Sequence, residues 1–285
     1  MIIWIASYPK SGNTWVRFFI LSILFGNKNR IDLNHLKKIE QFPIKSQFEN
    51  IGLHSKNLEN LKEISKNWIN AQKKINLSNK IQFYKTHNLL CQVEKNSFTD
   101  YKNTLGVIYI VRDPRNIITS LKNHYQKESY EDVKKFMFDE TSVISSPKNS
   151  EIKDYPLPQI IGSWKTHYKL WKTMKKNYLL IKYENLINHP ESEFKKISKF
   201  LEKNLKSKFN NEDLDRAISA SSFDKLESLE KESGFLESIT DNKTGKKKKF
   251  FYLGPKNNWN YLLDRKIVDD INIKFETEMK ELGYL

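Results

Sequence analysis

The feature that most constrains this chain is a strand, a tight polar turn and a helix near its N-terminal end. An apolar run over residues 2–7 predicts a buried strand, and apolar residues at helical spacing over 15–24 predict a buried helix. The turn between them reads Tyr-Pro-Lys-Ser-Gly-Asn-Thr. A helix that opens from such a turn points unpaired N–H groups and the positive end of its dipole outward, where phosphate binds. The sequence therefore predicts an oxyanion site at this turn.

The side chains of the turn support that interpretation. Lys10 adds a full positive charge, and Gly12 lets the backbone come close to an anion. Ser11, Asn13 and Thr14 can donate hydrogen bonds or cap the helix. The Walker A pattern places Gly-Lys-Ser/Thr after an earlier glycine, whereas this turn has one glycine, located after the lysine. An ordinary capped helix remains the alternative for these residues alone.

Length and charge set wider limits. A chain of 285 residues allows one large α/β domain or two smaller ones, and we expect a single domain over 1–285. The formal net charge of +15 predicts an anionic partner, which could be a nucleotide, an acidic glycan, nucleic acid or a membrane surface. The many Lys, Asn and Ile residues are equally consistent with a composition bias of the source, so the charge does not choose among these partners.

Cysteine usage and hydropathy bear on the compartment. Cys91 is the only cysteine, which excludes an intrachain disulfide and a cysteine-based zinc site and favours a reducing compartment. No basic region precedes the apolar N-terminal run, and no apolar run approaches the roughly 20 residues that cross a bilayer. We expect a cytoplasmic protein without a transmembrane segment.

The rest of the chain alternates predicted strands and helices. Further strands are predicted over residues 81–87, 104–111 and 178–186, and further helices over 57–77, 129–140, 160–174, 190–201 and 264–282. Residues 141–158 predict a long loop without secondary structure, and residues 234–254 predict a flexible basic excursion around four consecutive lysines, 246–249. The near-continuous apolar run over 104–111 is typical of a parallel strand that is covered on both faces. We expect an α/β fold, with a central parallel sheet flanked by helices on both faces, of the P-loop-like nucleotide-binding type.

A histidine at the end of the second predicted strand is a candidate base. His87 follows the alternating run 81–86, and the carboxyl ends of strands in open α/β sheets face the ligand crevice. An imidazole whose pKa is about 6.5 can accept a hydroxyl proton at neutral pH. A purely structural role is the alternative. The other histidines lack this setting: His35, His54, His124, His167 and His189.

A second strand, turn and helix unit repeats the first. Arg112 follows the strand over 104–111, Asp113 can cap the next helix, and Pro114 suits its first position. Ser120 lies eight residues after Arg112. The alternative for this segment alone is a capped helix with an exposed arginine.

Several segments resemble the sulfotransferases that use 3′-phosphoadenosine 5′-phosphosulfate (PAPS). Residues 8–15 are similar to their 5′-phosphosulfate loop, Tyr-Pro-Lys-Ser-Gly-Thr-Thr-Trp, and Asn13 is the one departure. Residues 84–87 are similar to the Lys-Thr-His segment of cytosolic sulfotransferases, and Arg112 and Ser120 match the spacing of their 3′-phosphate site. The resemblance runs over residues 4–260 and implies sulfuryl transfer from PAPS to a hydroxyl or amine acceptor, with 3′-phosphoadenosine 5′-phosphate (PAP) as product.

The resemblance also implies roles for the matching residues. Lys10 and the turn from Ser11 to Thr14 hold the 5′-phosphosulfate, Trp15 packs against the adenine, and Arg112 and Ser120 hold the 3′-phosphate. His87 is the general base, and Lys10 and Lys85 neutralise the charge that grows on the transferring group, so no metal is needed. The remaining matches are Tyr183 at the adenine, Ser222 and Phe223 beside it, and Gly254 in the last family signature.

That last signature is degraded in this chain. Tyr252 and Leu253 stand where the family has an arginine and a lysine that bind the 3′-phosphate. Lys249 and Lys256 are the candidate replacements, and a more weakly held cofactor is the alternative.

Two other functions fit parts of the sequence. One is a P-loop kinase, which the missing Walker A glycines disfavour. The other is a basic nucleic-acid-binding module, which would bind DNA or RNA with strong salt dependence. For the sulfotransferase we expect a small-molecule or glycan acceptor and no nucleic acid. The basic loop favours an anionic or sugar acceptor, whereas the aromatic content favours a hydrophobic alcohol.

Overall fold

The structure is a computed structural model that describes residues 1–26, 31–145, 153–241 and 244–285. The chain divides into two compact units, each assembled from three segments of the sequence. The first unit comprises residues 1–8, 39–109 and 138–180, and the second comprises residues 9–38, 110–137 and 181–285. The single domain expected from the sequence stays a prediction.

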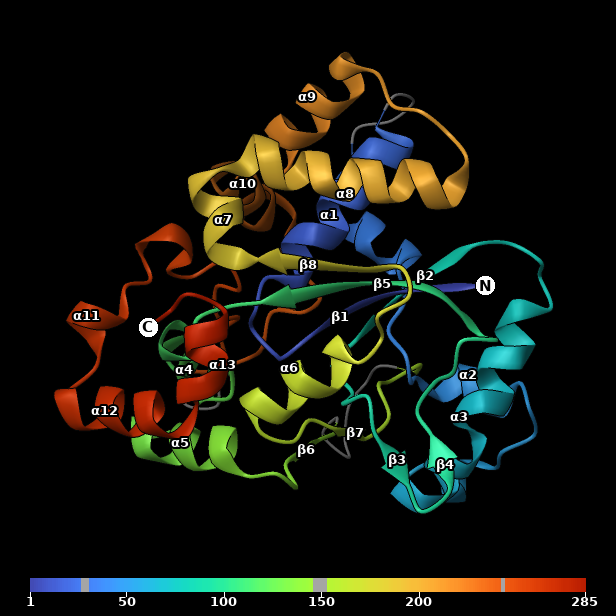
Figure 1. Cartoon of the computed structure of the whole chain (residues 1–285), viewed down its shortest axis with the longest axis horizontal. Coiled ribbons are helices and arrows are strands. Elements are labelled where there is room, and N and C mark those ends of the chain that lie inside the picture. The colour runs from blue at the N-terminus through green and yellow to red at the C-terminus, as the bar shows by residue number, and fades with distance from the viewer. Residues whose placement is uncertain (27–30, 146–152, 242–243) are drawn as a thin grey trace. The chain divides into compact units, whose positions relative to one another are not determined.

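A central parallel sheet of four strands, flanked by helices, confirms the predicted α/β fold (Figure 1). The strand order is β2-β1-β5-β8, with β1 at Ile2–Ser7, β2 at Gln82–Thr86, β5 at Thr104–Val111 and β8 at Tyr178–Lys182. β1 pairs in parallel with β2, so that Ile2 lies opposite Gln82 and Ala6 opposite Thr86. Every side chain of β1 is buried, as expected of a strand covered on both faces.

The other elements of the first unit are short except for one helix. They are α2 (Lys45–Glu49), α3 (Leu61–Asn76), β3 (Gln92–Val93), β4 (Asn96–Ser97), β6 (Val143–Ile144), β7 (Gln159–Ile160) and α6 (Trp164–Lys172). The Asn60 side chain accepts a hydrogen bond from the Lys62 backbone N–H, so α3 begins four residues after the predicted start.

Aromatic side chains form the core of the first unit. Trp4 is fully buried, and the rings of Phe42 and Phe98 each lie 5.4 Å from its ring. Trp68 of α3 and Trp171 of α6 pack edge-on against Phe98. Because these rings come from segments far apart in the sequence, burying them fixes helices α3 and α6 beside the strand that carries Trp4.

The predicted loop over 141–158 is wrong at its start. β6 pairs antiparallel with β7, and an isolated bridge joins Ile44 to Pro156. A two-residue strand is too short to show a hydrophobic period, so no sequence pattern indicates it. The helix predicted over 160–174 begins only at Trp164, because Gln159 and Ile160 form β7 and the Ser163 side chain caps α6. Residues 146–152 of the predicted loop lie outside the described residues.

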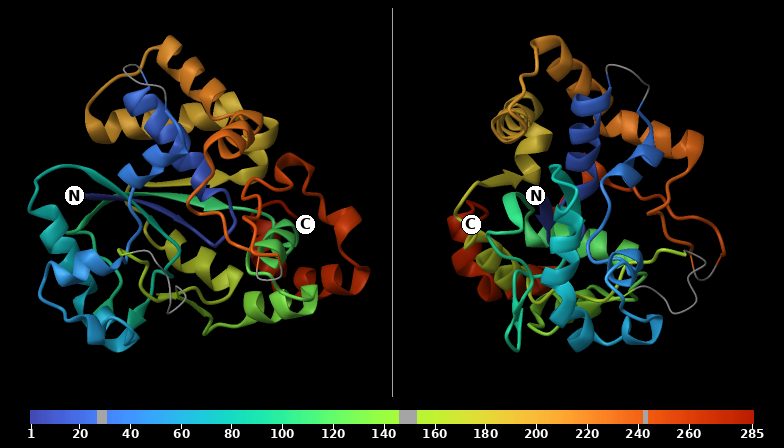
Figure 2. Two further views of the ribbon diagram at one scale, coloured as in Figure 1. Left: turned by 180° about the vertical axis from the view of Figure 1, so that it is seen from behind. Right: turned by 90° about the vertical axis from the view of Figure 1, so that its right-hand side faces the viewer.

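The second unit is helical. Its helices are α1 (Asn13–Phe25), α4 (Pro114–His124), α5 (Tyr130–Phe138), α7 (Tyr183–Asn188), α8 (Pro190–Leu205), α9 (Asn211–Ala220), α10 (Phe223–Ser233), α11 (Trp259–Leu262), α12 (Arg265–Lys274) and α13 (Glu276–Glu281). Helices α1, α8 and α9 pack together (Figure 2), and the rings of Phe19 and Phe194 stack at 4.2 Å.

Two predicted elements of the second unit need correction. The strand predicted over 178–186 ends at Lys182, because Tyr183 begins α7. The single helix predicted over 264–282 is two helices, since Phe275 leaves the helical conformation between α12 and α13. In the described ranges, no helix is both long and apolar enough to cross a membrane.

Candidate functional site

The turn before α1 has the backbone of an anion-binding loop. Lys10 has a φ of 65° and Gly12 a φ of 103°, so two backbone positions in three residues are left-handed. A Cβ atom at Gly12 would lie 2.6 Å from Cδ2 of Tyr183, which leaves no room for any other residue. Left-handed turns gather successive N–H groups into a concave anion site, and such strained backbone concentrates at functional sites.

The Ser11 hydroxyl of the turn is buried without a hydrogen bond. Ser11 Oγ forms no hydrogen bond with any residue that the structure describes. A buried hydroxyl without a hydrogen bond costs about 1–3 kcal/mol, which a bound ligand that accepts its hydrogen bond would recover. Oxygen atoms of a phosphosulfate would accept this hydrogen bond, and the turn therefore fits the predicted cofactor.

Within the second compact unit, Arg112 connects the end of β5 to this turn. Its guanidinium Nη1 donates to the Lys10 carbonyl oxygen at 3.0 Å and to Ser120 Oγ at 3.2 Å. The guanidinium carbon lies 4.0 Å from the ring centroid of Tyr183, in a stacked cation–π contact. The structure thus brings together four residues that the sequence singled out separately.

Ser120 is oriented by two donors. Besides Arg112, the side-chain amide nitrogen of Asn257 lies 3.2 Å from Ser120 Oγ, and Asn257 Oδ1 accepts a hydrogen bond from Thr119. Because its oxygen accepts two hydrogen bonds, the Ser120 hydroxyl directs its own proton away from both donors, toward an acceptor such as a phosphate oxygen. Asn257 was not predicted from the sequence, because its role depends on contacts with α4.

The predicted adenine residues form two contacting pairs. The rings of Trp15 and Tyr183 meet edge-on at 5.7 Å, and Trp15 Nε1 donates to the Ser221 carbonyl oxygen at 2.5 Å. A Cβ at Gly254 would lie 2.2 Å from the ring of Phe223, so glycine is required there. Ser222 is exposed and caps α10.

Two aromatic residues, Phe250 and Phe251, directly precede the degraded positions Tyr252 and Leu253 of the family signature. The Lys10 ammonium lies 3.9 Å from the ring centroid of Phe250. Glu230 accepts backbone hydrogen bonds from Phe250 and Phe251, at 2.6 and 2.9 Å. The segment predicted as a flexible excursion is therefore fixed to α10 at these two residues.

The two candidate replacement lysines differ in their surroundings. Lys249 forms an ion pair with Glu227 at 2.6 Å, and the Lys256 side chain is exposed. Neither forms a described contact with Arg112 or Ser120, so both stay unsupported as 3′-phosphate ligands.

A buried ion pair lies on the helix side of the turn. Arg17 Nη2 lies 2.6 Å from Glu237 Oε1 and 3.1 Å from Thr14 Oγ1, and the Thr14 hydroxyl donates to Glu237 Oε2 at 3.2 Å. The Arg17 side chain is 3% exposed, whereas that of Glu237 is 29% exposed. This ion pair was not predicted from the sequence, because Arg17 lies in an otherwise apolar helix and its partner is distant in sequence.

His87 belongs to the first unit, where contacts of its ring and its backbone hold it. Its Nδ1 lies 2.8 Å from the Ser7 carbonyl oxygen, its backbone N–H donates to Gln159 Oε1 at 3.0 Å, and its carbonyl oxygen lies 3.1 Å from His167 Nε2. A carbonyl can only accept, so Nδ1 carries a proton, and in the neutral imidazole Nε2 then carries the lone pair. This tautomer suits a general base that acts through Nε2.

His167 is a buried neutral residue behind His87. Burial lowers the pKa of His167 to about 3, and burial also keeps the pKa of Tyr109 above its ordinary value. The Tyr109 hydroxyl therefore donates to His167 Nδ1 at 2.9 Å, and His167 Nε2–H donates to the His87 carbonyl oxygen. A polar residue in the buried Trp164, Tyr168 and Trp171 stripe was the sequence signal for it.

Lys85 is a buried residue of β2 in the same unit. Its backbone N–H donates to the Glu40 carbonyl oxygen at 2.8 Å, and its carbonyl oxygen accepts from Phe42 at 2.9 Å. Lys85 and His87 therefore belong to the first unit, whereas Lys10 and the predicted cofactor residues belong to the second.

A parallel sheet with a left-handed turn between its first strand and the following helix defines an α/β protein of the P-loop-like class. The sequence profile described as Sulfotransferase domain matches residues 2–283. The chain therefore belongs to the sulfotransferase family, which confirms the resemblance.

Curated relatives are similar at low identity. Sulfotransferase 1B1 of Canis lupus familiaris is 25% identical over 225 residues, which cover 78% of this chain and 64% of the relative. Sulfotransferase 1 family member D1 of Mus musculus is 27% identical over 211 residues, which cover 70% of this chain and 59% of the relative. The chain thus spans less than two thirds of the length of these relatives.

Solved structures share the fold. Mouse sulfotransferase SULT7A1, complexed with PAP, matches 98% of this chain and 84% of its own with a TM-score of 0.60 at 19% identity. Retinol dehydratase, in complex with androsterone and inactive cofactor PAP, matches 98% of this chain and 80% of its own with a TM-score of 0.60 at 16% identity.

Proposed function

We propose that the chain is a PAPS-dependent sulfotransferase. The observation that carries this proposal is the hydrogen-bonded group in which Arg112 donates both to the carbonyl oxygen of Lys10 and to Ser120 Oγ. When bound, PAPS supplies a sulfuryl group, whose sulfur forms a bond to the acceptor oxygen as its bond to the phosphate oxygen breaks. The family match and the PAP complexes of similar structures support this choice over a kinase.

In this proposal the second unit holds the nucleotide. Lys10, the Ser11 hydroxyl and the backbone N–H groups that follow Gly12 bind the 5′-phosphosulfate, with Asn13 and Thr14 beside them. Arg112 and Ser120 bind the 3′-phosphate, for which the guanidinium supplies a charge-assisted donor. The aromatic residues Trp15, Tyr183 and Phe223, with Gly254 against Phe223 and Ser222 beside it, surround the adenine.

His87 is the proposed general base. The Nδ1–H bond to the Ser7 carbonyl oxygen leaves the lone pair on Nε2, which takes the proton of the acceptor hydroxyl. Lys85 and Lys10 stabilise the negative charge that develops on the oxygens of the transferring group. The His167 hydrogen bond to the carbonyl of His87 keeps this residue from shifting.

The test measures nucleotide binding and transfer separately. Calorimetry with PAP and with adenosine 5′-phosphate reports whether the protein recognises a 3′-phosphate. We expect clear preference for PAP. A protein that binds both ligands equally, or that hydrolyses ATP with magnesium, contradicts the proposal.

The role of His87 has its own test. His87→Ala should lower sulfuryl transfer from labelled PAPS by about 10²- to 10⁴-fold while PAP affinity stays unchanged. His54→Ala, at an exposed position, is the matched control. Unchanged turnover in His87→Ala would show that His87 is not the general base.

Acceptor and location are part of the same proposal. We expect a small-molecule or glycan acceptor with a hydroxyl or amine group, and labelled PAPS with fractionated extracts will identify it by the product that carries the label. The single cysteine, Cys91, supports a reducing, cytoplasmic location.

A further inference from the structure

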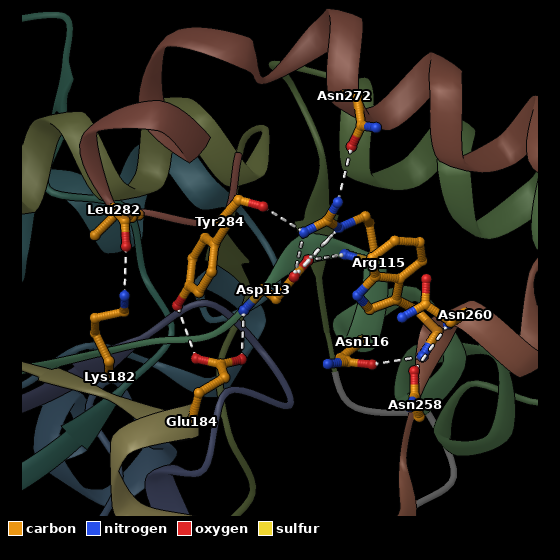
Figure 3. Close-up of polar contacts among 11 residues, drawn as sticks. Asp113, Arg115, Asn116, Lys182, Glu184, Asn258, Asn260, Asn272, Leu282 and Tyr284 are labelled. Atoms are coloured by element: carbon orange, nitrogen blue, oxygen red, sulfur yellow. Dashed lines mark hydrogen bonds and ion pairs between the residues drawn. The ribbon is translucent and has the colours of Figure 1, made fainter. Parts of the chain in front are cut away.

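Four residues of the second unit form a closed ring of hydrogen bonds (Figure 3). Arg115 Nη2 donates to Asp113 Oδ2 and to the Tyr284 carbonyl oxygen, each at 2.7 Å. The Tyr284 hydroxyl donates to Glu184 Oε2 at 2.8 Å, and Glu184 Oε1 accepts from the Asp113 backbone N–H at 2.9 Å. The ring joins the start of α4, the start of α7 and the segment after α13.

The ring is held firmly in place. The side chains of Asp113 and Arg115 are each 6% exposed, and the Arg115 guanidinium carbon lies 4.0 Å from the ring centroid of Trp259. Burial raises the pKa of the Glu184 carboxyl, and burial first, then the nearby Glu184 charge, keeps the pKa of the Tyr284 phenol well above its ordinary value. Tyr284 therefore remains a hydrogen-bond donor at every physiological pH.

Tyr284 is also anchored outside the ring. Its backbone N–H donates to the Met279 carbonyl oxygen at 2.8 Å. The Lys182 ammonium donates to the Leu282 carbonyl oxygen and lies 4.7 Å from the centroid of the Tyr284 ring. The residue just before Tyr183 therefore holds the same segment from the other side.

The ring lies one residue from two proposed nucleotide ligands. Arg112 precedes Asp113, and Tyr183 precedes Glu184. Two consecutive residues of one segment thus meet two consecutive residues of the other: Arg112 stacks on Tyr183, and the Asp113 N–H binds Glu184. A shift of either backbone segment would disturb both contacts, because the two residues that make them are consecutive in each segment.

We propose that Tyr284 is a positioning residue for the 3′-phosphate site, acting through Glu184 and Asp113 on the stacked pair Arg112 and Tyr183. The inference rests on the proposed function, since it assumes that Arg112 binds the 3′-phosphate. Tyr284 itself contacts Glu184 and Arg115 and would act on the 3′-phosphate site through them. Its hydroxyl fixes the Glu184 carboxylate, and its carbonyl oxygen fixes Arg115.

The test is Tyr284→Phe, which removes one hydroxyl and keeps the aromatic side chain next to the Lys182 ammonium. Calorimetry measures the dissociation constants of PAP and of adenosine 5′-phosphate, which lacks the 3′-phosphate. We expect PAP to bind about 3- to 10-fold more weakly, which corresponds to the net contribution of one hydrogen bond. Adenosine 5′-phosphate should bind with unchanged affinity. A residue with only a structural role would lower both affinities together.

A second pair of variants tests the same path at Glu184. Glu184→Gln keeps an acceptor for the Asp113 N–H, whereas Glu184→Ala removes it. The loss of PAP selectivity should therefore be larger for Glu184→Ala than for Glu184→Gln. Tyr261→Phe, at a residue that is 87% exposed, is the control for the loss of a tyrosine hydroxyl and should leave both affinities unchanged.

The outcomes separate the two claims. If the wild-type protein prefers PAP and the Tyr284→Phe and Glu184→Ala proteins keep the full preference, the Tyr284 inference is overturned and the proposed function stands. If the wild-type protein binds PAP and adenosine 5′-phosphate equally, the proposed function fails and the inference fails with it. A selective loss for PAP in both variants supports both claims.

Discussion

The guanidinium group of Arg112 donates a hydrogen bond to the carbonyl oxygen of Lys10 at 3.0 Å, across 102 residues of sequence. Each residue follows a parallel strand and precedes a helix, so the contact joins the ends of two similar strand, turn and helix units. A charged donor on a carbonyl oxygen of the anion turn holds that turn in its left-handed form. In the proposed function the same arginine also binds the 3′-phosphate.

Arg112→Lys tests the planar group at this position. Lysine keeps the charge but loses the stacked contact on Tyr183 and the fixed, planar set of N–H donors of the guanidinium. We therefore expect PAP affinity to fall by about tenfold or more. Calorimetry with PAP measures the change. Arg265→Lys, whose side chain is 93% exposed, is the control and should bind PAP like the wild type. Equal affinities for Arg112→Lys and wild type would contradict the prediction.

Gly12→Ala tests the close approach of the turn to Tyr183. The added Cβ meets both an unfavourable φ of 103° and a ring atom at 2.6 Å. Gly52→Ala is the matched control, since Gly52 has a φ of 88° and open space around it. We expect Gly12→Ala to lower the free energy of unfolding by about 1–3 kcal/mol more than Gly52→Ala, as overpacking does. Equal losses in urea unfolding would show that only the backbone matters.

The Arg17 and Glu237 pair predicts unequal effects of two mutations. Glu237→Ala leaves the Arg17 cation buried at 3% exposure, whereas Arg17→Met leaves the Glu237 carboxylate at 29% exposure, where water reaches it. We expect Glu237→Ala to lower the free energy of unfolding by about 3 kcal/mol and Arg17→Met by less than about half of that. Chemical denaturation measures both. A larger loss of unfolding free energy for Arg17→Met than for Glu237→Ala would mean that water reaches the Arg17 guanidinium.

His167 predicts a pH dependence of stability. Its pKa falls from 6.5 in the unfolded chain to about 3 in the folded protein. As the pH drops below 6.5, the unfolded chain takes up a proton that the folded protein refuses, so the free energy of unfolding falls by about 1.4 kcal/mol per pH unit until about pH 3. The stabilisation is therefore complete above pH 6.5.

His167→Gln should remove this dependence. Between pH 7.5 and pH 5 the free energy of unfolding should fall by about 2 kcal/mol less in His167→Gln than in the wild type. His54→Gln, at an exposed position, should keep the wild-type slope. Identical slopes for wild type and His167→Gln would show that His167 takes up its proton in the folded protein.

Local patterns were sufficient to predict much of this fold. The apolar runs at 2–7 and 104–111 became β1 and β5 with the predicted bounds, and Asp113 caps α4 at Pro114 as expected. Hydrophobic period, capping chemistry and proline position act within one or two turns of chain, so they can be read without the fold. The two-residue strand β6 and the break at Phe275 lie below what such periods resolve.

The residues that hold the candidate site were harder to predict. His167 contacts the His87 carbonyl across 80 residues, and nothing near His167 in sequence indicates that partner. Asn257 on Ser120 and Tyr284 on Glu184 are similar cases, at separations of 137 and 100 residues. A polar side chain gains a specific partner only when burial removes water as the competitor, and burial is a property of the packed chain.

The strand, turn and helix units and the family of the chain can be recognised in its sequence alone. The folded chain was needed to show that Gly12 packs against Tyr183, that Arg112 binds the Lys10 carbonyl oxygen and that Tyr284 closes a ring with Glu184. Backbone preferences are short-range and are therefore written in neighbouring residues. Hydrogen bonds between distant residues form only after the chain has folded and excluded water from both partners.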